Sequence, residues 1–232
     1  MHKLILSFPD LPEMPKVRFI RSSSSTLSPQ TLQLLESRFQ TTVLEAYAMT
    51  EASHQVTSNL LPPNKRKAGT VGLPRGVEVR ILDSQDIDIP QGEEGEICIR
   101  GNSITPGYLN NPVANEKSFT ADGFFRTGDQ GKVDNEGYLT ITGRIKELIN
   151  KGGENISPVE LDNLISSHPD VADVVVFAVD DEMYGQEPAA ALILSQGAEL
   201  KARELKKWIG ERVAAYKVPK KVSDLSADTK RG

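Results

Sequence analysis

The sequence lacks several features that would assign it to a particular class of protein. Its 232 residues contain one cysteine, Cys98, which cannot form an internal disulfide and so indicates a reducing intracellular compartment. No stretch approaches the roughly 18 apolar residues of a membrane span, and the opening segment, MHKLILSFPD, is too short for a secretory signal peptide. The final residues, DTKRG, differ from a Ser-Lys-Leu peroxisomal ending. We expect an intracellular chain, cytoplasmic or peroxisomal, without a membrane span.

An excess of positive charge is absent as well. The 27 basic and 32 acidic residues leave a formal net charge of −5, which argues against a general nucleic-acid binder, whose affinity comes from neutralised phosphates. With 38% hydrophobic and 25% charged residues, the composition is ordinary for a soluble globular protein. A chain of this length holds one large or two modest domains. Composition alone therefore indicates no particular function.

The pattern of apolar residues predicts a β-α-β unit near the start of the chain. Residues 17–22 and 43–48 are expected to be strands, and residues 29–39 a helix that begins after Ser28-Pro29. The segments VEVRILD and GEICIRG then alternate strictly between apolar and polar residues, and short strands continue through GYLTITG. Such segments favour half-exposed strands of a small β-barrel or an antiparallel sheet. Cys98 lies in one of them, which indicates a core thiol rather than a nucleophile.

The pattern changes after residue 146 to that of a compact α+β unit. The expected order is strand 147–150, helix 158–167, strand 171–179, strand 189–194 and helix 200–213. We therefore place a domain boundary between Arg144 and Lys146, with domains at 1–145 and 146–232. The predicted fold class is α/β followed by α+β.

Two segments carry the residues that suggest chemistry. Residues 124–160 place an Asp, an Arg and a Lys between glycine-marked turns, before a helix opened by Ser157-Pro158. Residues 45–55, EAYAMTEASHQ, follow the apolar pair Val43-Leu44 and so stand where a buried strand ends. Ligands of α/β proteins collect at such strand ends. A nucleotide site with a moving joint is the function that this arrangement favours.

The motifs YAMTE, FFRTGD and GRIKELINKGGENISP, in this order, resemble the acyl-adenylate-forming superfamily of acyl-CoA ligases, luciferases and peptide-synthetase adenylation domains. The resemblance runs from about residue 17 to about residue 222, and it is strongest to the subgroup of peroxisomal oxalate–CoA ligases. It implies that residues 1–145 are the C-terminal portion of the large AMP-binding domain and that 146–232 are most of its small lid. The implied cofactors are ATP, Mg²⁺ and CoA, and the implied substrate is a small carboxylate.

The resemblance also implies roles in adenylate formation. Thr50 would contact the α-phosphate, Glu51 would bind Mg²⁺, and Tyr47 would stack on adenine. Asp129 would accept the ribose hydroxyls, for which a carboxylate has two suitable oxygens, and Arg144 would contact the same nucleotide. The alternatives are ordinary: a Thr-Glu pair caps a turn, and an Asp with an Arg forms a surface ion pair.

Further implied roles belong to the lid. Lys146 matches the hinge, where a few backbone dihedrals absorb the rotation of a lid. Gly152 and Gly153 match a loop that lines the pantetheine tunnel, since glycine lets the backbone approach a ligand closely. The alternatives are a solvated lysine and a plain turn before a helix.

The acyl substrate would meet a polar neighbourhood made by Ser23, Ser24, Ser25, Ser53 and His54. A fatty-acyl pocket calls for apolar lining, so a small dicarboxylate such as oxalate fits better, with His54 as a donor to the second carboxylate. A 4-coumarate-like or medium-chain acyl-CoA ligase is the nearest alternative, because it shares every nucleotide motif.

Two motifs of the family are missing, so the chain is expected to be truncated at both ends. Nothing in residues 1–46 matches the TSGTTGxPK phosphate loop, whose backbone cradles the phosphates. At the other end VSDLSADTKRG stands in place of the PKTxxGK motif, and Lys230 does not take the catalytic role. A non-catalytic nucleotide- or CoA-binding fragment is the alternative from a different class.

Overall fold

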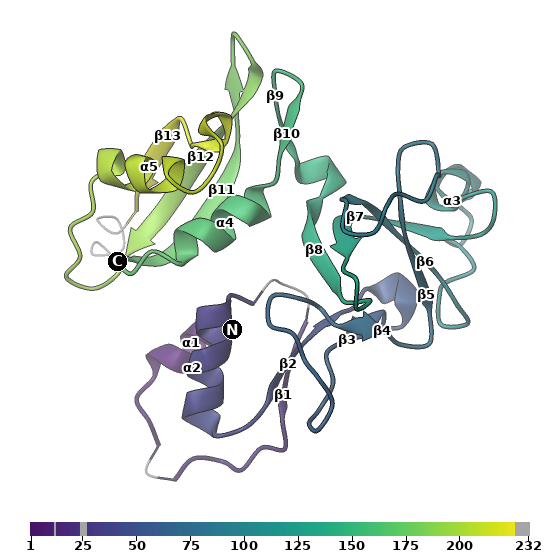
Figure 1. Ribbon diagram of the computed structural model, residues 1–232, viewed down its shortest axis with the longest axis horizontal. Coiled ribbons are helices and arrows are strands. Elements are labelled where there is room, and N and C mark those ends of the chain that lie inside the picture. Colours follow the sequence, from purple (N-terminus) through teal and green to yellow (C-terminus); the bar gives the residue numbers. More distant parts are fainter. Residues whose placement is uncertain (12, 24–26, 226–232) are drawn as a thin grey trace. The chain divides into compact units, whose positions relative to one another are not determined.

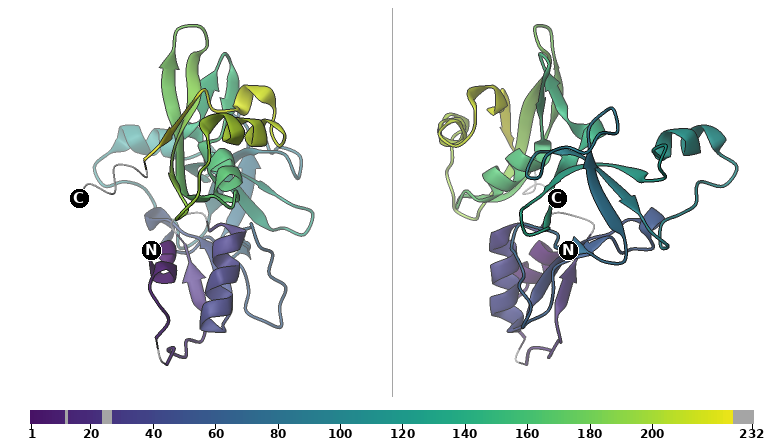
Figure 2. Two further views of the ribbon diagram at one scale, coloured as in Figure 1. Left: turned by 90° about the vertical axis from the view of Figure 1, so that its left-hand side faces the viewer. Right: turned by 45° about the vertical axis from the view of Figure 1, so that its right-hand side comes forward.

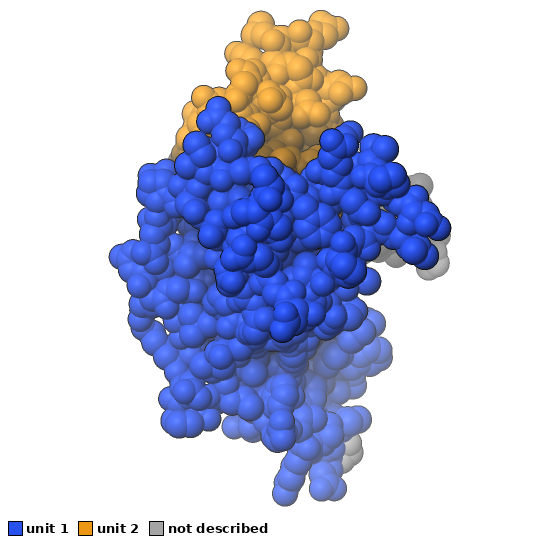
Figure 3. All heavy atoms as spheres, turned by 90° about the vertical axis from the view of Figure 1, so that its right-hand side faces the viewer, with its two compact units in different colours: residues 1–141 blue, residues 142–232 orange. Residues whose placement is uncertain are grey.

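The computed structural model describes residues 1–11, 13–23 and 27–225, so the predictions for Ser24, Ser25 and Lys230 lie outside the described residues. The chain divides into two compact units, residues 1–141 and 142–232, which Figure 3 colours separately. The predicted joint at Arg144 to Lys146 lies a few residues into the second unit. Within the described part of the chain, no helix is long and apolar enough to cross a membrane.

The first unit contains the expected β-α-β arrangement, in which β1 (Ile20–Ser22) pairs parallel with β2 (Val43–Tyr47). Helix α2 (Pro29–Phe39) connects them and lies against the strands (Figure 1). It begins where predicted because Ser28 accepts a hydrogen bond from the Thr31 amide and proline occupies the first turn. Strands β3 (Thr57–Ser58) and β4 (Leu73–Pro74) extend the sheet in the order β1-β2-β3-β4. The predicted α/β class is confirmed here.

Two short helices complete the first unit. Helix α1 (His2–Ser7) lies beside α2, where the Arg38 guanidinium donates to three carbonyl oxygens at the end of α1, those of Ile5, Phe8 and Pro9. Helix α3 (Pro112–Ser118) is capped by Asn111, whose side chain accepts from the Ala114 amide. Neither helix was predicted, because both are short and their apolar pattern is weak.

A second sheet in the first unit runs in the order β5-β6-β7-β8. Its strands are β5 (Glu78–Leu82), β6 (Gly95–Arg100), β7 (Phe125–Val133) and β8 (Leu139–Arg144). The first and last strands of this order do not pair with each other, so the described strands form an antiparallel sheet. Of the two forms predicted from the alternation, a small barrel or an antiparallel sheet, the structure has the sheet. Cys98 is fully buried between Leu82 and Phe124, and burial raises the pKa of its thiol to about 12. The thiol is therefore a core group, as expected.

The second unit is a five-stranded sheet with helices on one face (Figures 1 and 2). Strands β9 (Ile149–Lys151) and β10 (Glu154–Ile156) form a short hairpin, and β11 (Val171–Asp181) and β12 (Gly185–Leu194) form a long one. Strand β13 (Lys221–Asp224) pairs parallel with β12. Single turns of 3₁₀-helix, η2 (Ile145–Glu147) and η3 (Ala215–Lys217), precede β9 and β13.

Helices α4 (Pro158–Ser166) and α5 (Ala202–Gly210) supply the apolar side chains that cover this sheet. Leu161, Ile165, Leu205 and Ile209 are fully buried against strand residues such as Val176. The predicted α+β class is confirmed for this unit. The predicted helix 200–213 is shorter than expected at both ends, because Lys201 caps it and the backbone leaves the helix after Gly210.

Candidate functional site

The chain that leaves the C-terminal end of β2 forms a tight turn. Thr50–Ala52 is one turn of 3₁₀-helix, η1, and the next two residues, Ser53 and His54, have positive φ values of 51° and 59°. The Met49 carbonyl accepts hydrogen bonds from the amides of Ala52 and His54, at 3.2 and 3.0 Å. Non-glycine residues in this region cost roughly 1 kcal/mol or more each. Such conformations are typical of positions where a side chain must be presented in one direction.

Tyr47 and Asp129 lie together although 82 residues separate them in sequence. The Tyr47 hydroxyl donates a hydrogen bond to Asp129 Oδ2, and the two residues are only 6% and 7% exposed. The Tyr47 ring packs in the core beside Ala52 and Val56. A carboxylate has about four lone-pair positions, so Asp129 can accept further hydrogen bonds from a ligand. The structure thus joins the residues predicted for adenine and ribose in one buried pair.

A β-bulge in β7 aims Asp129. Glu96 and Cys98 on β6, two residues apart, pair with Gln130 and Arg126 on β7, four residues apart. The two extra residues are accommodated at Gly128, whose φ is +70° and whose amide donates to a Glu96 carboxylate oxygen at 3.0 Å. Bulges redirect side chains beside binding sites. The Asp is therefore a strand residue and not the turn or cap that Gly-Asp alone suggests.

Glu51 lies next to a tyrosine that the motifs did not indicate. The Tyr108 hydroxyl donates to Glu51 Oε1 at 2.9 Å, and the Thr105 amide donates to the Glu51 carbonyl at 2.7 Å. Burial, together with the hydrogen bond to Glu51, raises the pKa of Tyr108. The only feature of the sequence that marked Tyr108 was its position directly after Gly107 in a turn. Thr50, the other residue predicted for the phosphate, is exposed beside Glu51.

A magnesium ion would find a single carboxylate here. Among the residues that the structure describes, no group of three or more His, Cys, Asp or Glu side chains could hold a metal. Mg²⁺ commonly uses one or two carboxylates together with substrate phosphates, rather than an all-protein cage. Glu51, half-buried at a strand end, fits that mode.

Two of the predicted substrate residues, Ser23 and His54, contact an arginine that the sequence did not single out. Arg21 Nη2 donates to the His54 carbonyl at 3.3 Å and to Gln55 Oε1 at 3.1 Å, while Nη1 makes a long contact of 3.5 Å with Ser23 Oγ. Ser53 Oγ donates to a backbone carbonyl at 3.0 Å. Parallel pairing of β1 with β2 brings Arg21, Ser23 and His54 to the same edge of the sheet.

The remaining predicted residues lie in the second unit. Arg144 is exposed at the end of β8, and Lys146 is exposed in η2. Gly152 and Gly153 form the turn between β9 and β10, with φ values of +60° and +96°. The Gly152 amide donates to the Tyr184 carbonyl at 2.8 Å. Lys146, Gly152 and Gly153 therefore belong to elements of the second unit alone, whereas Arg144 ends the strand β8 that neighbours β7 in its sheet.

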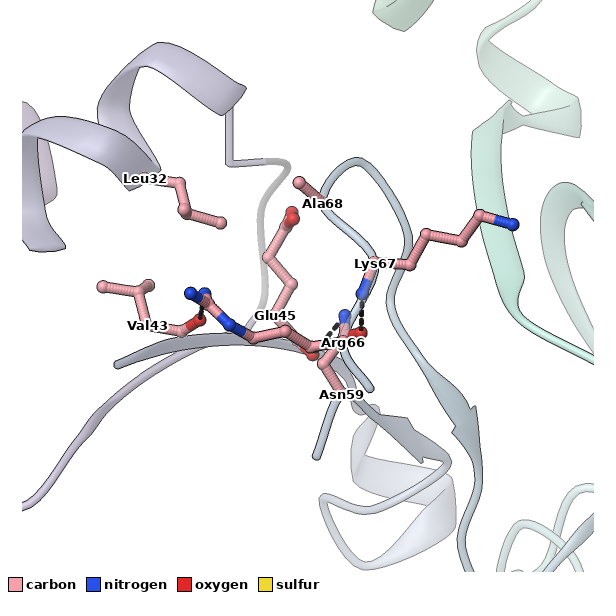
Figure 4. Close-up of a pocket in the computed structure, with 7 residues that line it drawn as sticks. All are labelled: Leu32, Val43, Glu45, Asn59, Arg66, Lys67 and Ala68. Atoms are coloured by element: carbon pink, nitrogen blue, oxygen red, sulfur yellow. Dashed lines mark hydrogen bonds between the residues drawn. The ribbon is translucent and has the colours of Figure 1, made fainter. Parts of the chain in front are cut away.

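A small cavity lies between α2, β2 and the loop before β4, and Figure 4 shows the seven residues that line it. Its volume is about 10 Å³, the room that a single water needs. The Glu45 carboxylate enters it; Oε1 accepts from the Leu27 amide at 3.3 Å, and Oε2 has no hydrogen-bond partner among the described residues. Burial raises the pKa of Glu45 to about 7. An acidic residue inside the apolar run VLEAY was the signal for this site.

Comparison with known proteins assigns both parts of the chain. Residues 1–109 match the family model of the AMP-binding enzyme, and residues 160–230 match that of the AMP-binding enzyme C-terminal domain. Together the two models span most of the sequence, in the order that the motifs suggested.

Two similar curated proteins are oxalate–CoA ligases. The one from Saccharomyces cerevisiae is 54% identical over 94% of this chain, and the one from Arabidopsis thaliana is 48% identical over 96%. The chain spans 40% and 44% of these relatives. The crystal structure of ATP-bound MatB from Rhodopseudomonas palustris covers 97% of this chain with a TM-score of 0.88 and 31% identity, and the chain covers 45% of it.

Proposed function

This chain belongs to the AMP-binding enzyme family, and on that premise we propose that it is part of an ATP-dependent acid–thiol ligase. The enzyme forms an acyl-adenylate from a carboxylate and then a CoA thioester, with oxalate as the acid and ATP, Mg²⁺ and CoA as cofactors. Its location is the cytoplasm or the peroxisome. Because the chain spans less than half of its relatives' length, the activity is that of the whole protein.

The observation that carries this proposal is the buried hydrogen bond between Tyr47 and Asp129. Tyr47 is close along the chain to Thr50 and Glu51. In the first half-reaction Asp129 accepts the ribose hydroxyls, Thr50 donates to the α-phosphate and Tyr47 supports adenine. Arg144 adds positive charge to the same nucleotide. Glu51 would hold a Mg²⁺ ion, which would screen the phosphate charge against the incoming carboxylate.

Glu51 is the carboxylate that would hold this ion, with Tyr108 fixing its orientation through the 2.9 Å hydrogen bond. Tyr47 supports a base through the edge of its ring, since the ring is almost wholly packed in the core and its hydroxyl donates to Asp129. Binding of the magnesium ion by Glu51 and support of adenine by Tyr47 both use residues of the first unit alone.

Oxalate is favoured over larger acids by the polar character of the strand ends. Ser23 Oγ and the His54 carbonyl lie beside the Arg21 guanidinium, and Ser53 precedes His54 in the same turn; charge-assisted donors suit a second carboxylate. A 4-coumarate-like or medium-chain ligase would need apolar lining at the same place. The two oxalate–CoA ligases in the comparison support this choice.

The second half-reaction belongs to residues 146–232, proposed as the lid, with residues 1–145 as the C-terminal portion of the large domain. Lys146 is the hinge, where an exposed single turn of 3₁₀-helix can absorb dihedral changes. Gly152 and Gly153 line the path of the pantetheine thiol, because backbone without side chains lets a ligand approach.

A chimera tests the function independently of where this chain begins and ends. The chain replaces the matching part of a full-length oxalate–CoA ligase, and oxalyl-CoA formation is measured with oxalate, ATP, Mg²⁺ and CoA. We expect turnover that requires all four, and loss of turnover in the Asp129→Ala chimera. A folded chimera that binds AMP or CoA without making thioester would favour a non-catalytic binding role.

A further inference from the structure

The turn between β9 and β10 is fastened to the start of β12. The Gly152 amide donates to the Tyr184 carbonyl at 2.8 Å, and the Asn150 amide donates to Gln186 Oε1 at 2.8 Å. Figure 1 shows the β9–β10 hairpin beside the tip of the β11–β12 hairpin. The glycine turn therefore rests on the neighbouring hairpin and does not project freely from the sheet.

A lysine in the same turn is held by an acid and two tyrosines. Lys151 Nζ lies 2.7 Å from Glu187 Oε2, donates to the Tyr216 carbonyl at 3.1 Å, and stands 5.5 Å from the centre of the Tyr184 ring. Its three partners come from β12, from η3 and from the segment between β11 and β12. One ammonium group thus ties three separate segments to the glycine turn.

This ion pair is shielded from water. The Lys151 and Glu187 side chains are 15% and 6% exposed, whereas in the pair between Lys217 and Glu160 the acid is 42% exposed. Salt and water screen a buried pair much less than an exposed one. Burying two charges also carries a desolvation cost that an apolar pair would avoid. A gain in stability therefore does not explain why charges occupy these positions.

Their geometry supplies a reason. Gly152 has no side chain, and a Cβ there would approach the Tyr184 ring to 3.2 Å. The Lys151 ammonium group also lies over the face of the Tyr184 ring, and a cation attracts an aromatic face. The glycine backbone, the ring and the ammonium group form one packed set, and an apolar residue at 151 could not reach the Tyr216 carbonyl with a hydrogen bond.

We propose that Lys151 is a positioning residue, whose ion pair with Glu187 and hydrogen bond to Tyr216 keep the Gly152–Gly153 turn docked on the β11–β12 hairpin. The consequence for chemistry rests on the proposed function: a docked turn presents its backbone to the pantetheine thiol in one shape, so less ordering is required when CoA binds. Lys151 acts on the second half-reaction through the turn and does not contact the reacting atoms.

Amide hydrogen exchange at Gly152 tests the docking in the 232-residue chain without any substrate. Lys151→Met removes the charge and keeps an apolar stem, and we expect exchange at Gly152 to become at least about tenfold faster because its bond to Tyr184 opens more often. Lys132→Met, which removes an exposed ion pair with Glu94 in the first unit, is the control and should leave Gly152 unchanged. Protection at Gly152 in Lys151→Met equal to that of the wild type would overturn the proposal.

A second variant separates positioning from stability. Lys151→Met alone leaves the Glu187 carboxylate buried without its cation, and it can unfold the unit. Lys151→Met combined with Glu187→Leu removes both charges, and thermal stability should recover. Exchange at Gly152 should stay fast in this folded double variant. Recovery of both stability and slow exchange would show that the pair acts on stability alone.

The chimera extends the test to activity. Lys151→Met should lower the rate of thioester formation by about tenfold relative to the rate of oxalate-dependent pyrophosphate exchange measured on the same variant. An equal fall in both rates would contradict a role confined to the turn. A wild-type chimera with neither activity would refute the proposed function, while the exchange result at Gly152 would still decide the docking.

Discussion

Substituting Glu45 by Gln should make the first unit more stable, and by an amount that depends on pH. Glu45 is buried, and burial raises its pKa from 4.5 to about 7, although the Leu27 and Gly69 amides oppose this. Since one pKa unit corresponds to about 1.4 kcal/mol, ionising Glu45 costs roughly 3 kcal/mol more in the folded chain than in the unfolded chain. Gln has nearly the same shape and never ionises, and it still accepts from Leu27.

Whether stability rises or falls with pH depends on which state, folded or unfolded, keeps the Glu45 proton. Below about pH 4.5 Glu45 is protonated in both states, so its burial carries no ionic cost. Between 4.5 and about 7 the unfolded chain releases the proton and the folded chain keeps it, so stability falls as pH rises. Above that window the loss is complete. The advantage of Glu45→Gln over the wild type should therefore grow by roughly 3 kcal/mol from about pH 4.5 to about pH 8.

The charged side chains beside Glu45 do not cancel this effect. Arg66 and Lys67 line the cavity (Figure 4), but Arg66 forms an ion pair with Glu36, and Lys67 forms ion pairs with Asp134 and Glu136. The pKa values of Glu36, Asp134 and Glu136 are lowered, so these carboxylates stay ionised across the upper half of the window.

Urea unfolding followed by methyl signals of Leu32 and Leu35, both of them in the first unit, gives the free energies at each pH. Glu36→Gln is the matched control. Although burial opposes it, hydrogen bonds from Arg66 and the Val43 amide lower the pKa of Glu36, so the deficit of this variant relative to the wild type should grow as pH rises to about 4.5 and stay constant above it. A difference between Glu45→Gln and the wild type that stays constant with pH would refute the reasoning.

The remaining predictions concern the site. In the chimera, Asp129→Ala should lower adenylation for every carboxylate tried, measured by pyrophosphate exchange, because it removes the ribose acceptor; activity confined to some acids would argue otherwise. His54→Ala should cost roughly tenfold to a hundredfold with oxalate, the range of a charge-assisted hydrogen bond, and far less with a monocarboxylate; equal losses would make His54 structural. Limited proteolysis of the 232-residue chain should cut near Lys146, and a chain resistant there would count against the hinge.

Local signals predicted much of the fold. Helix α2 begins and ends where Ser28, Pro29 and the apolar spacing indicated, and the long strands of the second unit follow their apolar runs. Strands β3, β4, β10 and β13 were missed, because segments of two to four residues are strands only through the partners they pair with. Their sequences contain no signal that a single-chain pattern can reveal.

The sequence predicted which residues belong to the candidate site, but it did not predict which of them contact one another. Motifs named Tyr47 and Asp129 separately, whereas their hydrogen bond depends on two sheets meeting and on a bulge at Gly128. Arg21 and Lys151 carry ordinary-looking positive charges, and only the fold shows which groups they hold.

Transfer of oxygen from oxalate to AMP would show directly whether the reaction passes through an acyl-adenylate. The chimera is supplied with ¹⁸O-labelled oxalate, ATP, Mg²⁺ and CoA, and the AMP and pyrophosphate are examined by mass spectrometry. When a carboxylate oxygen attacks the α-phosphate and CoA then displaces AMP from the carbonyl, that oxygen leaves with AMP. We expect one labelled oxygen in each AMP, unlabelled pyrophosphate, and an amount of oxalyl-CoA equal to that of AMP. Thioester formed with unlabelled AMP would contradict it.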